Sequence, residues 1–190
     1  MAPILGIWAS GAQPAANATS FESIATVSVG SGGAADVEFT SIPADYTHLQ
    51  LRVIGRTAKA SGNDYAKLTF NNVGGTSYAT HYLWGTGSSV QFHAFTSSSF
   101  IYLDFVTGTS QLSNSFSAYV LDILDYANTN KNKTVRWLGG QDLNGDGVII
   151  LQSGLFNNTA AISSIKLVPN SATNWLQYSH FALYGIKGAA

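Results

Sequence analysis

The sequence predicts an all-β protein, an antiparallel β-sandwich of the jelly-roll kind with an extended N-terminal arm. From Phe21 onward, apolar and polar residues alternate with a period of two. Short β-rich runs are separated by turns of Gly, Ser and Asn, and no window of ten residues has helical periodicity with capping residues. We therefore expect an arm over residues 1–20 and one sandwich domain over residues 21–190.

Each strand is predicted where a β-rich run lies between turn signals. In the run 47–56, Leu49, Leu51 and Val53 share one face and polar side chains share the other. Glycine-rich turns follow several runs, and Asn144-Gly145 is typical of a primed hairpin turn. The expected strands, in chain order, cover residues 21–29, 36–40, 47–56, 65–70, 78–84, 100–106, 115–126, 148–152, 162–168 and 176–186.

The segment 115–126 differs from the others because it is apolar on both sides. Its alternating residues form one apolar set that contains Ala118 and Val120 and a second set of Tyr119, Leu121 and Ile123. Such a strand has apolar neighbours on both faces. It is either the central strand of the sandwich or part of a subunit contact, and Tyr119, Leu121 and Ile123 are the expected oligomer contact.

The charge of the chain is low, with 9 Lys and Arg and 10 Asp and Glu among 190 residues. No basic face is expected, which excludes nucleic acid as a partner. The only basic cluster, Lys131, Lys133 and Arg136, is interpreted as a solvated turn. Because no apolar run approaches the roughly 18 residues of a membrane helix, we expect a soluble chain without membrane insertion.

The first 20 residues contain the apolar side chains Ile4, Leu5, Ile7 and Trp8 among residues that favour turns. A secretion signal needs a positive segment before its apolar core, but the first charged residue is Glu22. We therefore reject a signal peptide. These four side chains are instead expected to anchor the protein to a partner.

A weak calcium candidate consists of Asp142, Asn144 and Asp146, which resemble the first half of an EF-hand loop. The position that should supply a bidentate Glu is Ser153, and β-rich runs flank the loop. A polar hairpin turn is the favoured alternative. The histidines lack metal-ligand spacing, so no cofactor is expected.

No catalytic residue is predicted, and we expect no enzymatic activity. Asp122 and Asp125 point to opposite faces of a regular strand, which is the wrong geometry for a carboxylate pair. Asp104 could meet one of them across a sheet. The binding chemistry that the sequence favours is aromatic, because rings beside amides recognise sugars, and the candidates for a glycan contact are Tyr82, Trp84 and Trp137. The alternative is that these rings fill the core or a subunit contact.

Several segments resemble a family of small virion structural proteins of tailed bacteriophages, known as decoration, head-fibre or tail-fibre-like proteins. They are FESIAT at 21–26, SIPADYTHLQLR at 41–52, LDILDY at 121–126 with residues 128–133, and FALYGIKG at 181–188. The resemblance runs from about Phe21 to Gly188. It implies a jelly-roll-like, homotrimeric particle protein located in the virion and assembled in the host cytoplasm, and it carries no catalytic residue onto this chain.

The short chain favours one role within that family, because it has no heptad shaft or repeat array to hold a receptor-binding tip away from the particle. We expect a capsid cement or decoration protein whose partners are itself, the major capsid protein and other virion proteins. The alternative is a tail-fibre or baseplate module that recognises a host-surface glycan.

Overall fold

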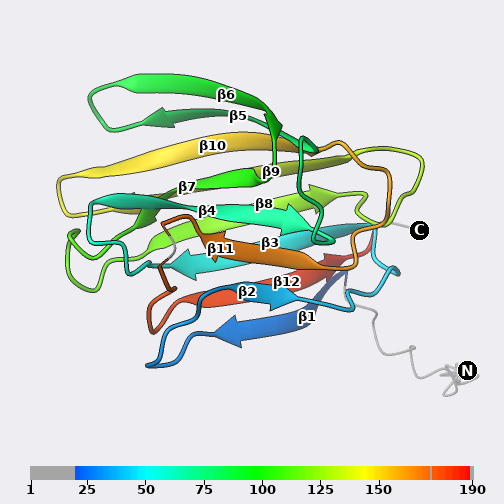
Figure 1. Cartoon of the computed structure of the whole chain (residues 1–190), viewed down its shortest axis with the longest axis horizontal. Helices are drawn as coiled ribbons and strands as arrows, with labels where there is room; N and C mark the ends of the chain where they lie inside the picture. Colours follow the sequence, from blue (N-terminus) through cyan, green and yellow to red (C-terminus); the bar gives the residue numbers. More distant parts are fainter. Residues whose placement is uncertain (1–19, 172, 189–190) are drawn as a thin grey trace, which may run out of the picture.

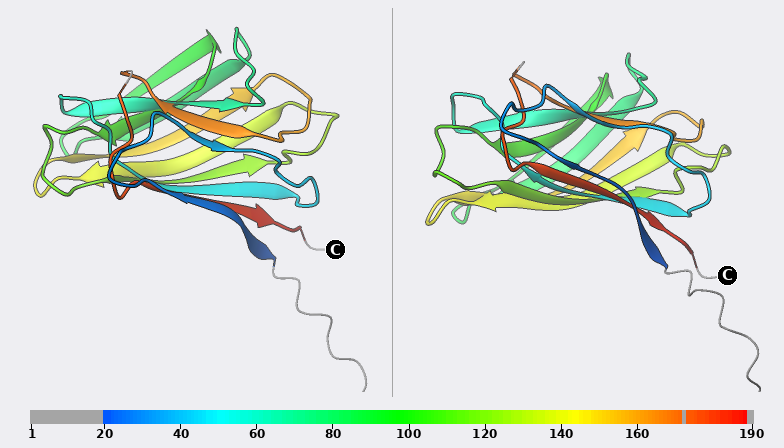
Figure 2. Two further views of the ribbon diagram at one scale, coloured as in Figure 1. Left: turned by 60° about the horizontal axis from the view of Figure 1, so that its bottom comes forward. Right: turned by 90° about the horizontal axis from the view of Figure 1, so that it is seen from below.

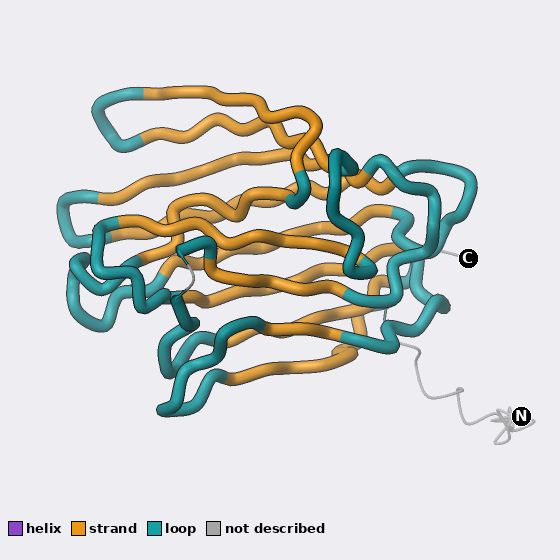
Figure 3. Tube along the Cα trace, in the orientation of Figure 1, coloured by secondary structure: helices purple, strands orange, loops and turns teal. Residues whose placement is uncertain are grey.

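The computed structural model describes residues 20–171 and 173–188, which form two antiparallel β-sheets packed face to face (Figure 1). None of these residues lies in a helix that could cross a membrane. The predicted anchoring residues Ile4, Leu5, Ile7 and Trp8 lie outside the described residues. Figure 3 shows that the strands run through the middle of the sandwich and that the loops gather at its two ends.

The larger sheet contains eight strands, each hydrogen-bonded to its neighbours in antiparallel register. Their order across the sheet is β1 (Phe21–Ser28), β12 (His180–Ile186), β3 (His48–Gly55), β8 (Ser117–Leu124), β9 (Lys133–Asp142), β10 (Gly147–Phe156), β5 (Tyr78–Gly85) and β6 (Val90–Ser98). The smaller sheet has the order β2 (Val37–Phe39), β11 (Ile165–Pro169), β4 (Asn63–Phe70) and β7 (Ile101–Thr107). Figure 2 shows the two sheets as separate layers.

The core lies between the two layers and follows the period of two. Leu49, Leu51 and Val53 of β3 are no more than 1% exposed, as the alternation of this segment predicts. Aromatic rings fill the other half of the core: Tyr78 stacks on Phe156 with ring centroids 5.0 Å apart, and Phe156 lies 5.5 Å from Phe70. In the interior strands, residues i and i+2 therefore enter the core, and the intervening residues form the outer faces.

These sheets confirm the prediction of an all-β, antiparallel sandwich. Each of the ten predicted segments overlaps one of the observed strands, whereas β6 and β9 were not predicted. The strand β9 begins in the basic cluster that was interpreted as a solvated turn. That interpretation is wrong for Lys133, which is fully buried, and for Arg136, which lies within the strand.

The structure also corrects the predicted oligomer contact. Tyr119, Leu121 and Ile123 are at most 2% exposed and face the core, so they are not available to another subunit of the folded protein. Strand β8 lies between β3 and β9 in the interior of the larger sheet. This agrees with the other interpretation of the segment, that of a central strand. The opposite face of the same strand, with Ala118 and Val120, is exposed.

Candidate binding surface

The outer face of the eight-stranded sheet carries a row of large apolar side chains in register. Val120 pairs with Leu138, Leu138 with Leu151, Leu151 with Leu83, and Leu83 with Phe92. These five side chains, from five neighbouring strands, are between 43% and 86% exposed. Strands lie about 4.8 Å apart, so this apolar row extends roughly 20 Å across the sheet.

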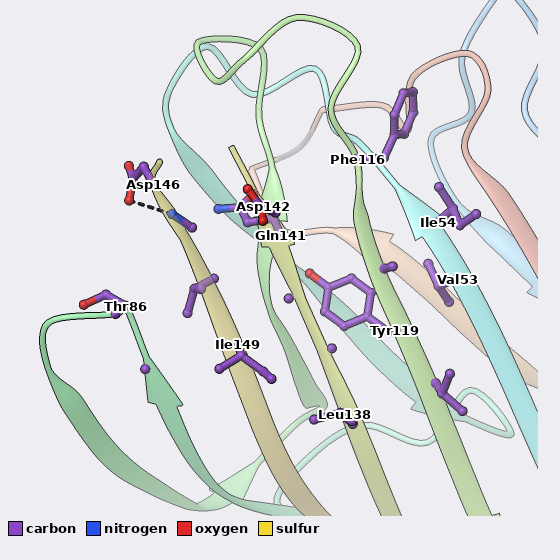
Figure 4. Close-up of a pocket in the computed structure, with 18 of the residues that line it drawn as sticks. Val53, Ile54, Thr86, Phe116, Tyr119, Leu138, Gln141, Asp142, Asp146 and Ile149 are labelled. Carbon is purple, nitrogen blue, oxygen red and sulfur yellow. Dashed lines mark hydrogen bonds between the residues drawn. The ribbon is translucent and has the colours of Figure 1, made fainter. Parts of the chain in front are cut away.

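A second row lies two residues further along the strands and is interrupted by glycines. Ile54 pairs with Ala118, whose partner in β9 is Gly140, and Ile149 pairs with both Gly140 and Gly85. Ile54 and Ile149 are 48% and 63% exposed, whereas the glycines contribute no side chain between them. The result is an open trough of about 910 Å³, which both rows line (Figure 4).

The other end of the apolar row is also hollowed. A depression of about 600 Å³ is lined by Leu83, Phe92 and Leu151 of the apolar row together with Arg136 and His81. Contiguous apolar surface of this kind marks interaction sites, whereas single exposed apolar residues are ordinary. The hollows and the apolar row therefore form one candidate surface for contact with a partner.

Polar side chains border the apolar row on its far side from the trough. Gln50 donates a hydrogen bond from Nε2 to Asp122 Oδ1 over 3.0 Å, and Arg136 Nη2 lies 3.3 Å from Asp122 Oδ2. Nearby, the guanidinium of Arg52 lies 5.3 Å from the ring centroids of both Phe21 and Tyr184. An apolar centre with a paired, polar rim is the usual anatomy of a protein–protein interface.

The outer face of the four-stranded sheet has a different character. Lys67, Thr69 and Lys166 occupy neighbouring positions there, and Lys166 Nζ lies 2.9 Å from Asp36 Oδ2 and 3.8 Å from Glu38 Oε2. The hydrogen bond and charge of Asp36 raise the pKa of Lys166. One outer face is thus charged and internally paired, and the other is apolar.

The predicted calcium loop forms the turn between β9 and β10, at one end of the trough. Asn144 and Gly145 have φ of 62° and 109°, as a primed hairpin turn requires. Asp142 Oδ1 accepts a hydrogen bond from the Asn144 N–H over 3.0 Å, and Asp146 Oδ1 accepts one from the Gly147 N–H over 2.7 Å. Both carboxylates therefore serve the turn itself, and residues 20–171 and 173–188 contain no group of three His, Cys, Asp or Glu that could hold a metal.

Comparisons with known proteins identify no relative of this chain. No protein-family model matches it, and neither the curated proteins nor the solved structures give a significant match.

Two of the three predicted glycan-contact residues belong to an aromatic cluster at the side of the sandwich, between the β5–β6 hairpin and β7. Tyr82 lies 5.3 Å from Trp84, Trp84 lies 5.7 Å from Phe105, and Phe95 stacks on Tyr102 at 4.5 Å, all between ring centroids. These five rings are half-buried. The prediction is wrong for the third residue, Trp137, which is 1% exposed and lies in the core.

A carboxyl group, Asp104, belongs to the same cluster. The register of β7 against β4 shifts beside it, and the following Phe105 has a φ of 59°, a left-handed conformation that bulky residues rarely adopt. Burial raises the pKa of Asp104, although a hydrogen bond with Tyr82 opposes that effect. Asp122 and Asp125 form ion pairs with Arg136 and Lys131, so each already has a partner other than Asp104.

Proposed function

We propose that this protein is a non-enzymatic structural component of a tailed-bacteriophage virion, a cement or decoration protein that binds shell proteins through the outer face of its eight-stranded sheet. The single observation that carries the proposal is the apolar row of Val120, Leu138, Leu151, Leu83 and Phe92. The resemblance to small virion proteins supplies the setting, and it carries no catalytic residue onto the chain.

The energetics of the surface support protein as the partner. Fully burying one exposed Leu, Val or Phe side chain contributes about 1.5–3 kcal/mol. The Val and Leu side chains of the apolar row are about half exposed and Phe92 is 86% exposed, so part of this free energy is still available to a partner. The bordering charges of Arg136 and Asp122 are already paired with each other, so covering this pair leaves neither of them isolated. A broad, hollowed apolar face suits the close packing of a protein that bridges shell subunits.

The order of the strands supports the jelly-roll part of the proposal. The smaller sheet has the order β2-β11-β4-β7. If the β8–β9 hairpin is treated as an insertion, the neighbouring part of the larger sheet has the four-stranded order β3-β10-β5-β6. A jelly roll consists of eight strands in two sheets. We infer a jelly roll to which β1, β12 and the β8–β9 hairpin have been added.

Sedimentation of the full chain with isolated phage capsids, and separately with isolated tails, tests the proposal. We expect binding to capsids, and we expect the double variant Leu138→Asp, Leu151→Asp to lose it because two charges would be buried against the shell. The matched control is Thr69→Asp on the charged outer face, which should bind like the parent. A folded double variant that still binds capsids would contradict the proposal that the apolar row makes the contact with the shell.

The arm is a second proposed attachment to the shell, through Ile4, Leu5, Ile7 and Trp8. Deleting residues 2–20 in the same assay separates the arm from the sheet face. Loss of capsid binding in the deletion and retention in the double variant would assign attachment to the arm, whereas the opposite pattern would assign it to the apolar row.

A second candidate function, recognition of a host-surface glycan by a tail-fibre or baseplate module, is favoured by the cluster around Trp84. Half-buried rings beside a carboxyl group provide both the stacking surface and the hydrogen-bond acceptor that sugars need. A glycan array with the full chain, repeated with Trp84→Ala and Tyr82→Ala, tests it. Hits that both variants lose, together with binding to tails rather than capsids, would favour this function over the first.

A further inference from the structure

The free edge of the eight-stranded sheet at β6 has few of the features that normally prevent strands from pairing with other chains, because its register against β5 shifts only at its far end, between Phe95 and Ser98. Strand β6 has nine residues, its only neighbour is β5, and Figure 1 shows it as the outermost strand of its sheet. It contains no Lys, Arg, Asp, Glu, Pro or Gly. Edge strands usually carry a charge, a proline or a bulge, or are very short, because an exposed regular edge is a template for pairing.

The other three edges of the sandwich do carry such features. Strand β2 has only three residues, with Glu38 at its centre. Strand β1 has a register shift between Ser23 and Ala25 and an ion pair between Glu22 and Lys187. Strand β7 has a register shift against β4 and the left-handed Phe105. In β6 the comparable interruption, a register shift with the left-handed Ser97, is confined to the last residues, so residues 90–95 form a regular, uncharged edge that is open to pairing.

The pairing of β6 with β5 fixes which of its backbone groups remain free. The N–H of Thr86 donates to the carbonyl of Ser89 over 3.1 Å, so these two residues form a hydrogen-bonded pair at the hairpin's end. In an antiparallel ladder such pairs alternate with non-bonded ones. Gln91 and His93 therefore direct their N–H and C=O groups toward β5, and Val90, Phe92 and Ala94 direct theirs toward the open edge.

The side chains of the edge are unusually exposed as well. Phe92 and Val90, at 86% and 76%, are the two most exposed large hydrophobic side chains in the described part of the chain. Phe92 is also the last member of the apolar row. The edge-directed backbone groups of β6 and the side chains of Val90 and Phe92 are therefore left without the contacts that an interior strand has.

We propose that β6 pairs antiparallel with β6 of a second copy of this chain, so that the two eight-stranded sheets become one continuous sheet about a two-fold axis. The regular pairing of the strand covers residues 90–95 and ends at a register shift that contains Ser97, which has a φ of 54°. An axis at His93 keeps residues 91–95 of both copies within this regular stretch. Phe92 then lies opposite the partner subunit's Ala94, and their edge-directed backbone groups form a hydrogen-bonded pair.

A second copy is the occupant that the strand itself favours. Since β6 has no acidic or basic side chain other than His93, pairing it with itself opposes no Lys, Arg, Asp or Glu of like charge. Its size pattern is also self-complementary, because the large Phe92 meets the small Ala94 twice, once on each side of the axis. An isologous contact of this kind closes at two chains.

This inference does not rest on the proposed function, because it is argued from the backbone and side chains of β6, although Phe92 belongs to both the edge and the apolar row. It differs from the three copies that the resemblance implies: pairing at one edge about a two-fold axis gives two. The apolar rows of the two copies would lie on the same face of the joined sheet, and that face would remain free for a shell protein.

Two measurements on the full chain test the edge pairing. Sedimentation equilibrium should give the mass of two chains for the parent, and of one chain for Ala94→Pro, which removes an N–H directed to the open edge and not one bonded to β5. Leu155→Lys on β10 is the matched control and should keep the mass of two chains. A parent that is a single chain at all concentrations, or three chains in both parent and Ala94→Pro, would overturn the proposal.

Cross-linking checks the register independently of how well Ala94→Pro folds. The chain has no cysteine, so His93→Cys introduces a single thiol on the axis, where directly opposed side chains have Cβ atoms about 4.5–5.5 Å apart. We expect mild oxidation to convert this variant to a disulfide-linked dimer. The control His81→Cys, on β5 and away from the edge, should stay monomeric on a non-reducing gel. Equal cross-linking of both variants, or of neither, would contradict the pairing.

Discussion

The ring of Tyr119 in β8 lies directly over Gly139, its cross-strand partner in β9. A Cβ atom at position 139 would overlap this ring and lie 2.7 Å from the Ala118 carbonyl oxygen. The ring is held from its other end, because the Tyr119 hydroxyl donates a hydrogen bond to the Asp104 carbonyl over 2.8 Å. The glycine thus makes room for an aromatic ring that joins the two sheets.

Substituting Gly139→Ala should therefore destabilise the fold. Overpacking a filled core costs about 1–3 kcal/mol, and here the atom that meets the new methyl group cannot move freely. Urea denaturation measures the free energy of unfolding, with Gly74→Ala as the control because nothing lies within 4 Å of a Cβ at that position. Equal stabilities of the two variants would show that the Tyr119 ring moves aside without cost.

Lys133→Met should also destabilise the protein, although the substitution removes a buried charge. The ammonium group of Lys133 donates to the carbonyls of Asn128, Lys131 and Thr159 over 2.5, 2.8 and 2.9 Å. Burial lowers the pKa of Lys133. In the Met variant, however, the three carbonyls lose the ammonium group that donates to them, and each buried unsatisfied group costs about 1–3 kcal/mol.

The matched control for Lys133→Met is Lys131→Met, two residues away. Lys131 is exposed and pairs only with Asp125 at the surface, where an ion pair contributes at most about 1 kcal/mol. Thermal unfolding of both variants should show a clear loss for the first and little change for the second. A larger loss for Lys131→Met would contradict the structural role given to the buried ammonium group.

The alternation in β3 and the turn at Asn144-Gly145 were predictable because each is encoded within a few neighbouring residues. The strand β9 was not, since the burial of Lys133 depends on carbonyls from two separate loops that a local pattern does not contain. Strand β6 was missed for a related reason: its apolar residues point outward at a free edge, so they give no core signal.

The candidate surface was less accessible to sequence reasoning than the fold. Val120, Leu138, Leu151 and Leu83 become a row only when the order and register of four strands are known, and one residue of slip would move each of them to the opposite face. The sequence identified β8 as apolar on both sides, yet it assigned the buried residues Tyr119, Leu121 and Ile123 to the contact. The local pattern of β8 does not show which of its two apolar faces packs against the smaller sheet.

Asp104→Asn should make the protein more stable at pH 7. Because burial raises the folded-state pKa of Asp104 above its ordinary 3.8, the ionised carboxylate disfavours folding. The parent therefore loses stability relative to the variant as the pH rises from 3.8 through the raised pKa. The Asn side chain keeps an oxygen that can accept a hydrogen bond from the Tyr82 hydroxyl. Unfolding free energies at pH 3 and pH 7 should differ between the proteins only at pH 7, and a difference that is independent of pH would rule out this cause.

Glu22→Gln should have the opposite pH dependence. Hydrogen bonds from Lys187 and from Tyr46, 2.9 and 3.1 Å long, lower the pKa of Glu22 below its ordinary 4.5. A lowered folded-state pKa gives stability that is present above pH 4.5 and is lost as the pH falls through the lowered value. The variant should be less stable than the parent at pH 7 and should match it in strong acid. A double-mutant cycle with Lys187→Gln isolates the pair, and a coupling free energy that persists below the lowered pKa would show that the charge of Glu22 is not what stabilises the contact between β1 and the residue after β12.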